Sequence, residues 1–301
     1  MKNAVIFAYH SVGVRCIKTL LARGIEIPLV ITHEDSATET IWFESVAKLC
    51  TENGIAFITP EHPNTREIIE KVGSISPDFI FSFYYRNMLA AELLSIPKHG
   101  AYNLHGSLLP KYRGRVPVNW AVLHGETETG ATLHEMTIKP DAGAIIAQTA
   151  VPILPDDTAF EVFGKLTVAA EQTLWSALPS LIAGTAPRLI NQLDAGSYFG
   201  GRKPEDGKID WTQSAQQVYN LHRAVAPPYP GAYDDLSGLK VIIKKARLAP
   251  KCPANLPLGL SVVDNTVFGV CGDGNALLVH ELLIDGDVLD ITELKRLFKA
   301  H

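Results

Sequence analysis

Three polar residues in the middle of the chain have the types that acyl transfer requires. Asn103 and His105 lie two residues apart in the stretch AYNLH, whose apolar character is that of a strand. In an extended chain, residues i and i+2 point to the same face, so the amide and the imidazole would share one surface. Asp141 lies further along, in the turn-like stretch KPDAG, and could fold back toward them.

Transfer of an acyl group to an amine would use all three side chains. Asn103 can donate hydrogen bonds to a developing oxyanion, and His105 can move protons between an attacking amine and a leaving group. A carboxylate such as that of Asp141 would orient the imidazole and raise its pKa. No nucleophile accompanies the set, because Ser107 lies in no GxSxG motif and no cysteine is near in sequence. Since a histidine on a strand is more often structural, spacing alone leaves this interpretation open.

The elements that must position these residues indicate an α/β fold. Apolar runs such as AVIFAY (4–9) and DFIFSFYY (78–85) alternate with helix-like segments. This alternation predicts βαβ units and a Rossmann-like, doubly wound parallel sheet. Ligand sites of such sheets lie at the carboxyl ends of strands, where His105 is expected. Neither GxGxxG nor GxxxxGK[ST] occurs in the chain, so the sequence disfavours NAD and a triphosphate cradle.

A second, smaller domain is expected after about residue 200. The stretch from Asp194 to Trp211 is rich in glycine and charge, and short strand-like runs follow it at close spacing. We therefore expect a catalytic domain over residues 1–200 and a β-barrel of OB-like type over residues 201–301.

The composition excludes some classes of function. The net charge of −5 gives no general attraction to nucleic acid, so we expect none as a partner. The four cysteines form no CxxC pair, which predicts no metal site and a reduced, cytoplasmic setting. The apolar run at the N-terminus stops at His10 and is too short for a signal peptide or membrane insertion.

The stretch NLHGSLLPKYRGR, together with the downstream KPDAG, resembles the 10-formyltetrahydrofolate-dependent formyltransferases. The similarity extends from VIFAYH through FSFYYRNML to RAVAPPYPGAY and is weakest after about Lys240. The resemblance implies that Asn103 stabilises the transition state, that His105 transfers protons and that Asp141 raises the pKa of His105. It names 10-formyltetrahydrofolate as the formyl donor and implies no metal. The residues it assigns to the folate site are Asn87, Met88, Leu89, Arg115, Thr137, Ile138, Lys139 and Pro140.

Within the family, the chain most resembles enzymes that formylate UDP-4-amino-4-deoxy-L-arabinose for lipid A modification and polymyxin resistance. The resemblance therefore implies two small-molecule partners, the folate and a UDP-linked amino sugar. Lys111 and Arg113, in the loop after the NLH stretch, are candidates for contacting the diphosphate.

Two alternatives remain open. The first is a methionyl-tRNA formyltransferase. In such an enzyme we expect a basic insertion where this chain has THEDSATETIWFES (32–45), which is acidic and holds no Lys or Arg. The basic stretch KVIIKKARLAPK near the C-terminus keeps this alternative open. The second is a folate- or nucleotide-binding protein without turnover, which the intact Asn/His/Asp set argues against.

Overall fold

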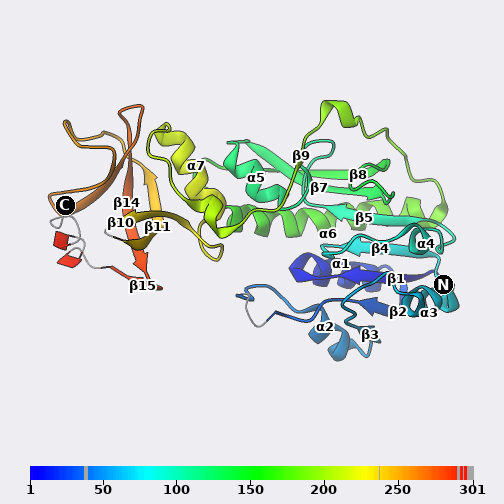
Figure 1. Cartoon of the computed structure of the whole chain (residues 1–301). Coiled ribbons are helices and arrows are strands. Elements are labelled where there is room, and N and C mark those ends of the chain that lie inside the picture. The colour runs from blue at the N-terminus through cyan, green and yellow to red at the C-terminus, as the bar shows by residue number, and fades with distance from the viewer. Residues whose placement is uncertain (37–39, 237, 290–291, 294, 297–301) are drawn as a thin grey trace. The chain divides into compact units, whose positions relative to one another are not determined.

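The computed structural model describes residues 1–36, 40–236, 238–289, 292–293 and 295–296 (Figure 1). The chain divides into two compact units. The first comprises Met1–Pro117, Glu128–Pro152 and Gly164–Gly200; the second comprises Val118–Thr127, Ile153–Phe163 and the chain from Gly201 on. Because two short segments before residue 200 belong to the second unit, neither unit is one continuous stretch. The division into domains 1–200 and 201–301 stays a prediction.

A seven-stranded sheet forms the centre of the first unit. The five strands from β1 to β5 run parallel, and β7 and β8 add an antiparallel hairpin at one edge. The predicted α/β fold is thus confirmed, with two antiparallel strands added to its parallel core. In spatial order the strands are β3 (Phe57–Ile58), β2 (Glu26–Ile31), β1 (Asn3–Ala8), β4 (Phe79–Phe83), β5 (Ala101–His105), β7 (Glu128–Glu135) and β8 (Ile145–Pro152).

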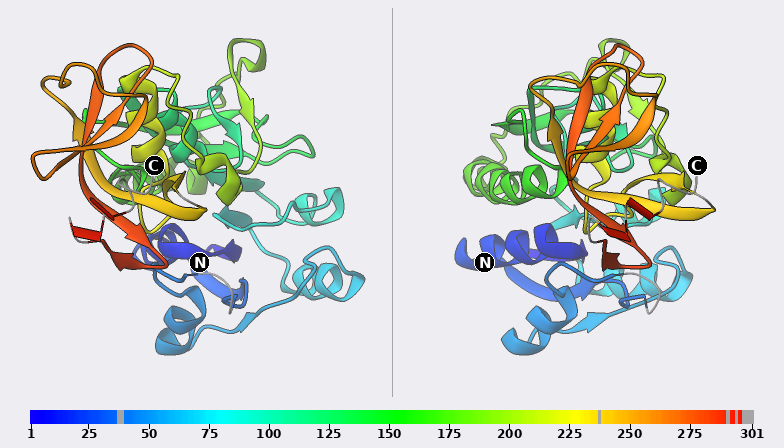
Figure 2. Two further views of the ribbon diagram at one scale, coloured as in Figure 1. Left: turned by 60° about the vertical axis from the view of Figure 1, so that its left-hand side comes forward. Right: turned by 90° about the vertical axis from the view of Figure 1, so that its left-hand side faces the viewer.

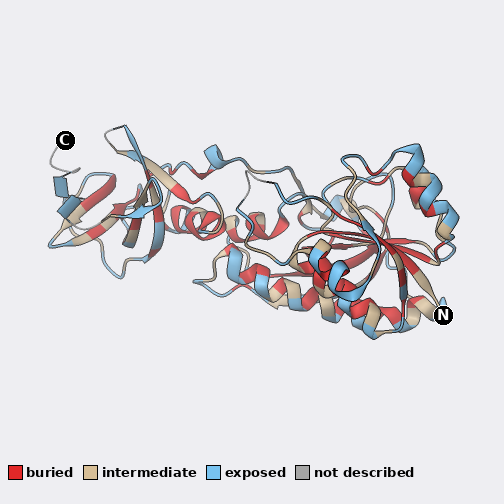
Figure 3. Ribbon diagram, turned by 90° about the horizontal axis from the view of Figure 1, so that it is seen from below, coloured by how far each residue is buried: buried red, intermediate tan, exposed pale blue. Residues whose placement is uncertain are grey.

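Helices cover both faces of the parallel strands. Val5 and Phe7 of β1 point to one face and pack in a buried cluster with residues of α3 and α4. The alternate residues of β1 point to the opposite face, where Gly13 of α1 lies against Ala8. Figure 3 shows the resulting buried strands in red. The helices of this part of the chain are α1 (His10–Ala22), α2 (Val46–Asn53), α3 (Arg66–Ile75), α4 (Ala91–Leu94), α5 (Pro117–Leu123) and α6 (Ala159–Ala183).

Local sequence explains where several helices begin and end. Ser45 and Thr65 accept hydrogen bonds from backbone N–H groups at the starts of α2 and α3, as capping residues do. Gly24 follows α1 with a φ of +74°, a left-handed conformation that suits a helix end. Pro179 lies inside α6, which continues to Ala183. No helix among the described residues is long and apolar enough to cross a membrane.

The second unit contains a six-stranded antiparallel sheet, which Figure 2 shows to curl on itself. The helix α7 (Ala215–Val225) precedes it and begins with a capping box between Ser214 and Gln217. Asp264 and Asn265 join two of the strands with positive φ at both positions, as a tight hairpin turn requires. The expected smaller β-rich part is therefore confirmed. Its strands are β10 (Ala232–Leu236), β11 (Leu239–Leu248), β12 (Gly259–Val263), β13 (Thr266–Val270), β14 (Ala276–Ile284) and β15 (Asp287–Val288).

Candidate active site

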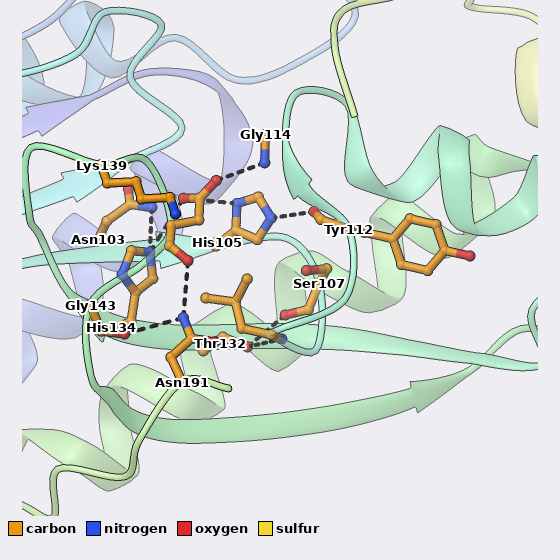
Figure 4. A network of polar contacts seen from close by, with 12 residues as sticks. Asn103, His105, Ser107, Tyr112, Gly114, Thr132, His134, Lys139, Gly143 and Asn191 are labelled. Carbon is orange, nitrogen blue, oxygen red and sulfur yellow. Dashed lines mark hydrogen bonds and ion pairs between the residues drawn. The ribbon is translucent and has the colours of Figure 1, made fainter. Parts of the chain in front are cut away.

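The structure brings Asn103, His105 and Asp141 together in the first unit. Figure 4 shows Asn103, His105 and the residues around them. His105, the last residue of β5, is only 6% exposed. Its Nε2–H donates to the backbone carbonyl of Tyr112 over 2.8 Å, and its Nδ1 lies 3.5 Å from Oδ1 of Asp141. The buried imidazole is therefore held on one side by a carbonyl and faces a carboxylate on the other.

Asp141 reaches this position from the turn between β7 and β8. Its Oδ2 accepts a 2.8 Å hydrogen bond from the backbone N–H of Gly114. Gly114 belongs to a short strand, β6 (Arg113–Gly114), that pairs in parallel with β9 (Tyr198–Phe199). A Cβ at Gly114 would collide with the Phe199 carbonyl oxygen, and its φ is +97°. Only glycine therefore fits the position whose N–H holds the carboxylate.

A fourth side chain, His134, joins the cluster, although the sequence analysis did not single it out. His134 of β7 lies directly opposite Asn103 of β5 in the antiparallel register. Its Nδ1–H donates to the Glu135 carbonyl (2.8 Å), so in the neutral ring Nε2 accepts the amide N–H of Asn103 (3.1 Å). The sequence shows only that Thr132 and His134 lie two residues apart in a strand-like run, and the pairing of the strands cannot be read from sequence.

The electrostatics of the cluster favour an ionised carboxylate beside a neutral imidazole. Burial lowers the pKa of His105 below its ordinary value, and this outweighs the nearby Asp141 and the Tyr112 carbonyl, which raise it. From the sequence we expected Asp141 to raise the pKa of His105. In the structure the effect of burial is larger, so the pKa of His105 is lowered overall. For Asp141, burial raises the pKa, but His105, His134 and the Gly114 N–H hold it well below its ordinary value.

The loop after β5 is fixed by buried hydroxyl groups. Ser107 donates to the Lys111 carbonyl (2.6 Å), and Thr132 of β7 donates to the Ser107 carbonyl (2.6 Å). The hydroxyl of Ser107 is therefore engaged in holding the loop. Gly106 leaves room for the Tyr84 side chain, whose hydroxyl oxygen would collide with a Cβ there. These contacts hold the loop that connects His105 of β5 to Gly114 of β6.

Except for Arg115, the residues expected at the folate site lie in two segments. Asn87, Met88 and Leu89 lie in the loop between β4 and α4, and Met88 is 52% exposed. Leu89 is 6% exposed and packs in the core, so only its backbone is available to a ligand. Thr137–Pro140 lead from β7 to Asp141, and Ile138 is 75% exposed.

A cavity of about 520 Å³ links the second segment to α4. Leu94, Met136 and Ile138 make much of its wall apolar. Thr137 and Lys139 also line it, and α4 begins two residues after Leu89. The exposed Arg115 lies next to Gly114, and its backbone N–H donates to the Phe199 carbonyl. Arg113 is in β6, and Lys111 is exposed in the loop before it.

Comparison with known families identifies the chain. The family described as formyl transferase matches residues 1–178, and the description formyl transferase, C-terminal domain, matches residues 202–298. The chain belongs to the formyl transferase family. It is a formyltransferase enzyme, and the Asn/His/Asp cluster lies within the part that the first match covers.

Solved structures share the formyltransferase fold. WlaRD, a sugar 3N-formyl transferase solved with dTDP and 5-N-formyl-THF, matches with a TM-score of 0.73 and 21% identity over 93% of this chain and 97% of its own. The N-formyltransferase from Helicobacter canadensis, in complex with folinic acid and dTDP-3-aminofucose, gives 0.72 and 21% over 93% and 99%. HypX from Aquifex aeolicus, in complex with tetrahydrofolic acid, gives 0.65 and 18% over 97% and 46%. At these identities the likeness concerns the fold.

Proposed function

We propose that this formyltransferase carries the formyl group of 10-formyltetrahydrofolate to the 4-amino group of a nucleotide-linked amino sugar, UDP-4-amino-4-deoxy-L-arabinose. The observation that carries the proposal is the cluster of Asn103, buried His105 and Asp141 in a formyl transferase fold. Two further facts support it. The sequence resembles the formyltransferase domain of the bifunctional polymyxin-resistance protein ArnA, and structures of similar fold hold folates with dTDP or a dTDP-amino sugar.

In the proposed reaction, the neutral sugar amine attacks the formyl carbon, and the carbonyl oxygen becomes an oxyanion. One N–H of the Asn103 amide is bonded to His134, which fixes the amide so that its second N–H can donate to that oxygen. His105 takes the amine proton and returns a proton to N10 of the folate as the carbon–nitrogen bond breaks. The products are the formamide of the sugar and tetrahydrofolate.

The contacts of His105 indicate which nitrogen exchanges the proton. Its Nε2–H is engaged with the Tyr112 carbonyl, so Nδ1 is the nitrogen with a lone pair in the neutral ring. A proton gained at Nδ1 would face Oδ1 of Asp141, 3.5 Å away, and the carboxylate would stabilise the imidazolium. Because burial lowers the pKa of His105, the ring is neutral and ready to accept a proton at pH 7.

For the folate, we propose contacts with Asn87–Leu89, Arg115 and Thr137–Pro140. The apolar wall of the 520 Å³ cavity beside α4 suits a flat ring system. The Met88 carbonyl accepts a hydrogen bond from the Asn64 side chain, which holds residues 87–89 in place two residues before α4. Arg115 would pair with a carboxylate of the glutamyl tail. No metal takes part in this scheme.

The proposal is tested by offering the protein three different amine acceptors in separate reactions. The protein is incubated with 10-formyltetrahydrofolate and, separately, UDP-4-amino-4-deoxy-L-arabinose, a dTDP-linked 3-amino sugar or methionyl initiator tRNA. We expect the mass of the UDP sugar to increase by one formyl group, with release of tetrahydrofolate. Formylation of the tRNA alone, or of the dTDP sugar in preference, would refute the proposed acceptor. No transfer to any amine would refute the reaction itself.

The segment that would discriminate against tRNA carries negative charge. Phosphate contacts dominate RNA affinity and need cations. Of the stretch 32–45, residues 37–39 lie outside the described part of the chain. In the remainder, Asp35 accepts a hydrogen bond from the Tyr9 hydroxyl, and the Glu44 backbone N–H donates to the Ser11 hydroxyl. These bonds hold the two acidic residues against the start of α1 in the first unit.

A further inference from the structure

A segment between the two family matches supports the catalytic cluster. Residues 189–199, here called the strap, follow α6 and lie outside both matched ranges, which end at residue 178 and begin again at residue 202. Leu189 exchanges two 2.9 Å backbone hydrogen bonds with Ile145 of β8. At its other end the strap forms β9, which pairs with β6. The strap thus runs past both pieces of chain that surround Asp141.

Asn191 of the strap is bonded directly to the turn that carries Asp141 (Figure 4). Its Nδ2 donates to the carbonyl oxygen of Asp141 over 3.0 Å and to that of Gly143 over 3.2 Å. The residue is 8% exposed, and its Oδ1 is buried without a hydrogen-bond partner among the described residues. Both neighbours of the amide nitrogen are acceptors, which fixes the orientation of the amide.

The turn held by Asn191 is constrained. Asp141 has a φ of +49°, in the left-handed region that costs a residue with a side chain some free energy. Gly143 leaves no room for a Cβ, which would collide with the Glu135 carbonyl oxygen. One amide therefore satisfies two carbonyls of a tight, strained turn and fixes the backbone from which the Asp141 carboxylate reaches Gly114 and His105.

The strap also supports the other side of His105. The Tyr112 N–H donates to the Ser197 hydroxyl over 2.8 Å, and the Tyr112 carbonyl accepts the His105 Nε2–H. The strap therefore holds both partners of the imidazole, through Asn191 on the carboxylate side and through Ser197 on the carbonyl side.

We propose that Asn191 is a positioning residue of the formyl-transfer site, which holds Asp141 where its carboxylate faces His105. The inference rests on the roles proposed above for His105 and Asp141. Asn191 touches neither the reacting atoms nor, in this structure, the imidazole, so it acts through the turn alone.

The pH dependence of turnover separates positioning from mere stabilisation. Among the described residues, the charges that act on His105 are Asp141, which raises its pKa, and His134, which lowers it. If the Asp141 carboxylate moves away, the pKa of His105 falls further. Since the base must be neutral, the acid limb of the kcat profile then shifts to lower pH. A variant that only loosened the fold would lower stability and leave that limb in place.

The test compares Asn191→Ala with the wild-type protein, with Asp141→Asn and with Gln192→Ala, a control at the exposed neighbouring position. We expect Asn191→Ala to lower kcat by about 10- to 100-fold, the cost of a small misplacement, with KM for both substrates changed less than about 2-fold. Its acid limb should shift in the same direction as that of Asp141→Asn, by a smaller amount. Gln192→Ala should match wild type.

If the alanine variant does not fold, Asn191→Leu repeats the test. The leucine side chain fills a similar buried volume but cannot form hydrogen bonds. Circular dichroism reports folding. A folded variant with the wild-type kcat and acid limb would overturn the inference. So would the failure of both variants to fold, because Asn191 would then be needed by the fold as a whole. Inactive wild-type protein would refute the proposed function instead.

Discussion

His105 is 6% exposed, whereas Ile138, three residues before Asp141, is 75% exposed. Each side chain of the catalytic cluster is held by another group of the protein: His105 by the Tyr112 carbonyl, Asp141 by the Gly114 N–H and Asn103 by His134. The segments proposed to bind folate instead include exposed side chains, such as Met88 and Ile138, and the second of them lines a cavity. Groups that perform chemistry gain from being fixed before the substrate arrives, while a binding surface must stay accessible until the ligand covers it. The two regions should therefore respond differently to substitution.

Removal of the two β5 side chains should give the largest effect. Asn103→Ala should lower kcat by about 10²–10³, as the loss of one oxyanion donor does, and His105→Ala by about 10²–10⁴. Since the two groups act as a unit, the double variant should lose little more than the worse single variant. Steady-state turnover of all three proteins tests this. Fully multiplicative losses would mean that the two side chains act independently.

Arg115→Ala should weaken folate binding about 10- to 100-fold, because a charge-assisted hydrogen bond is worth roughly 1.5–3 kcal/mol. The value of kcat at saturating folate should change little. Calorimetric titration with a stable formyl-folate analogue measures the affinity. Arg66→Ala, an exposed arginine on α3 paired with Glu70, is the control and should bind normally. Unchanged affinity in Arg115→Ala would remove that residue from the folate site.

Asp141→Asn should move the acid limb of the kcat profile to lower pH. Asp141 raises the pKa of His105 against the effect of burial, so the loss of its charge lowers that pKa further and keeps the base neutral in more acid solution. At pH 7 we expect kcat to fall about 10-fold, through poorer orientation of the imidazole. A kcat profile from pH 4 to 9 tests both expectations. An acid limb displaced to higher pH would contradict the assignment.

Ile138→Ser should have the smallest effect. If a folate ring covers this exposed side chain, the loss of its apolar surface should weaken folate binding by about 3-fold, with kcat unchanged. Leu154→Ser, at an exposed position in the second unit, should have no effect on folate binding. Equal affinities in the two variants would place Ile138 outside the ligand contact.

Local pattern was enough to predict some of these features. Apolar runs alternating with helical segments predicted the parallel core, and strand periodicity put Asn103 and His105 on one face. The antiparallel addition of β7 and β8 was not predicted, because a hairpin looks the same in sequence whichever edge it joins. His134 was not predicted as a site residue for the same reason, because it contacts Asn103 only through the pairing of β5 with β7.

Other features depend on contacts between distant residues. Asn191 lies 50 residues after Asp141 and bonds to backbone carbonyls, which leave no mark in the sequence. The reason why Gly114 and Gly143 are glycines is visible only once Phe199 and Glu135 are in place. The net pKa shift of His105 likewise follows from burial, which spacing did not reveal.

The contrast between the two regions is tested most directly by His105→Ala and Arg115→Ala measured side by side, in single-turnover formyl transfer and in folate binding. We expect opposite results. His105→Ala should bind folate within about 2-fold of wild type and transfer the formyl group at least about 100-fold more slowly, whereas Arg115→Ala should bind weakly and, at saturation, transfer at nearly the wild-type rate. A His105→Ala protein that retained near wild-type single-turnover rates would contradict the catalytic role of the buried cluster.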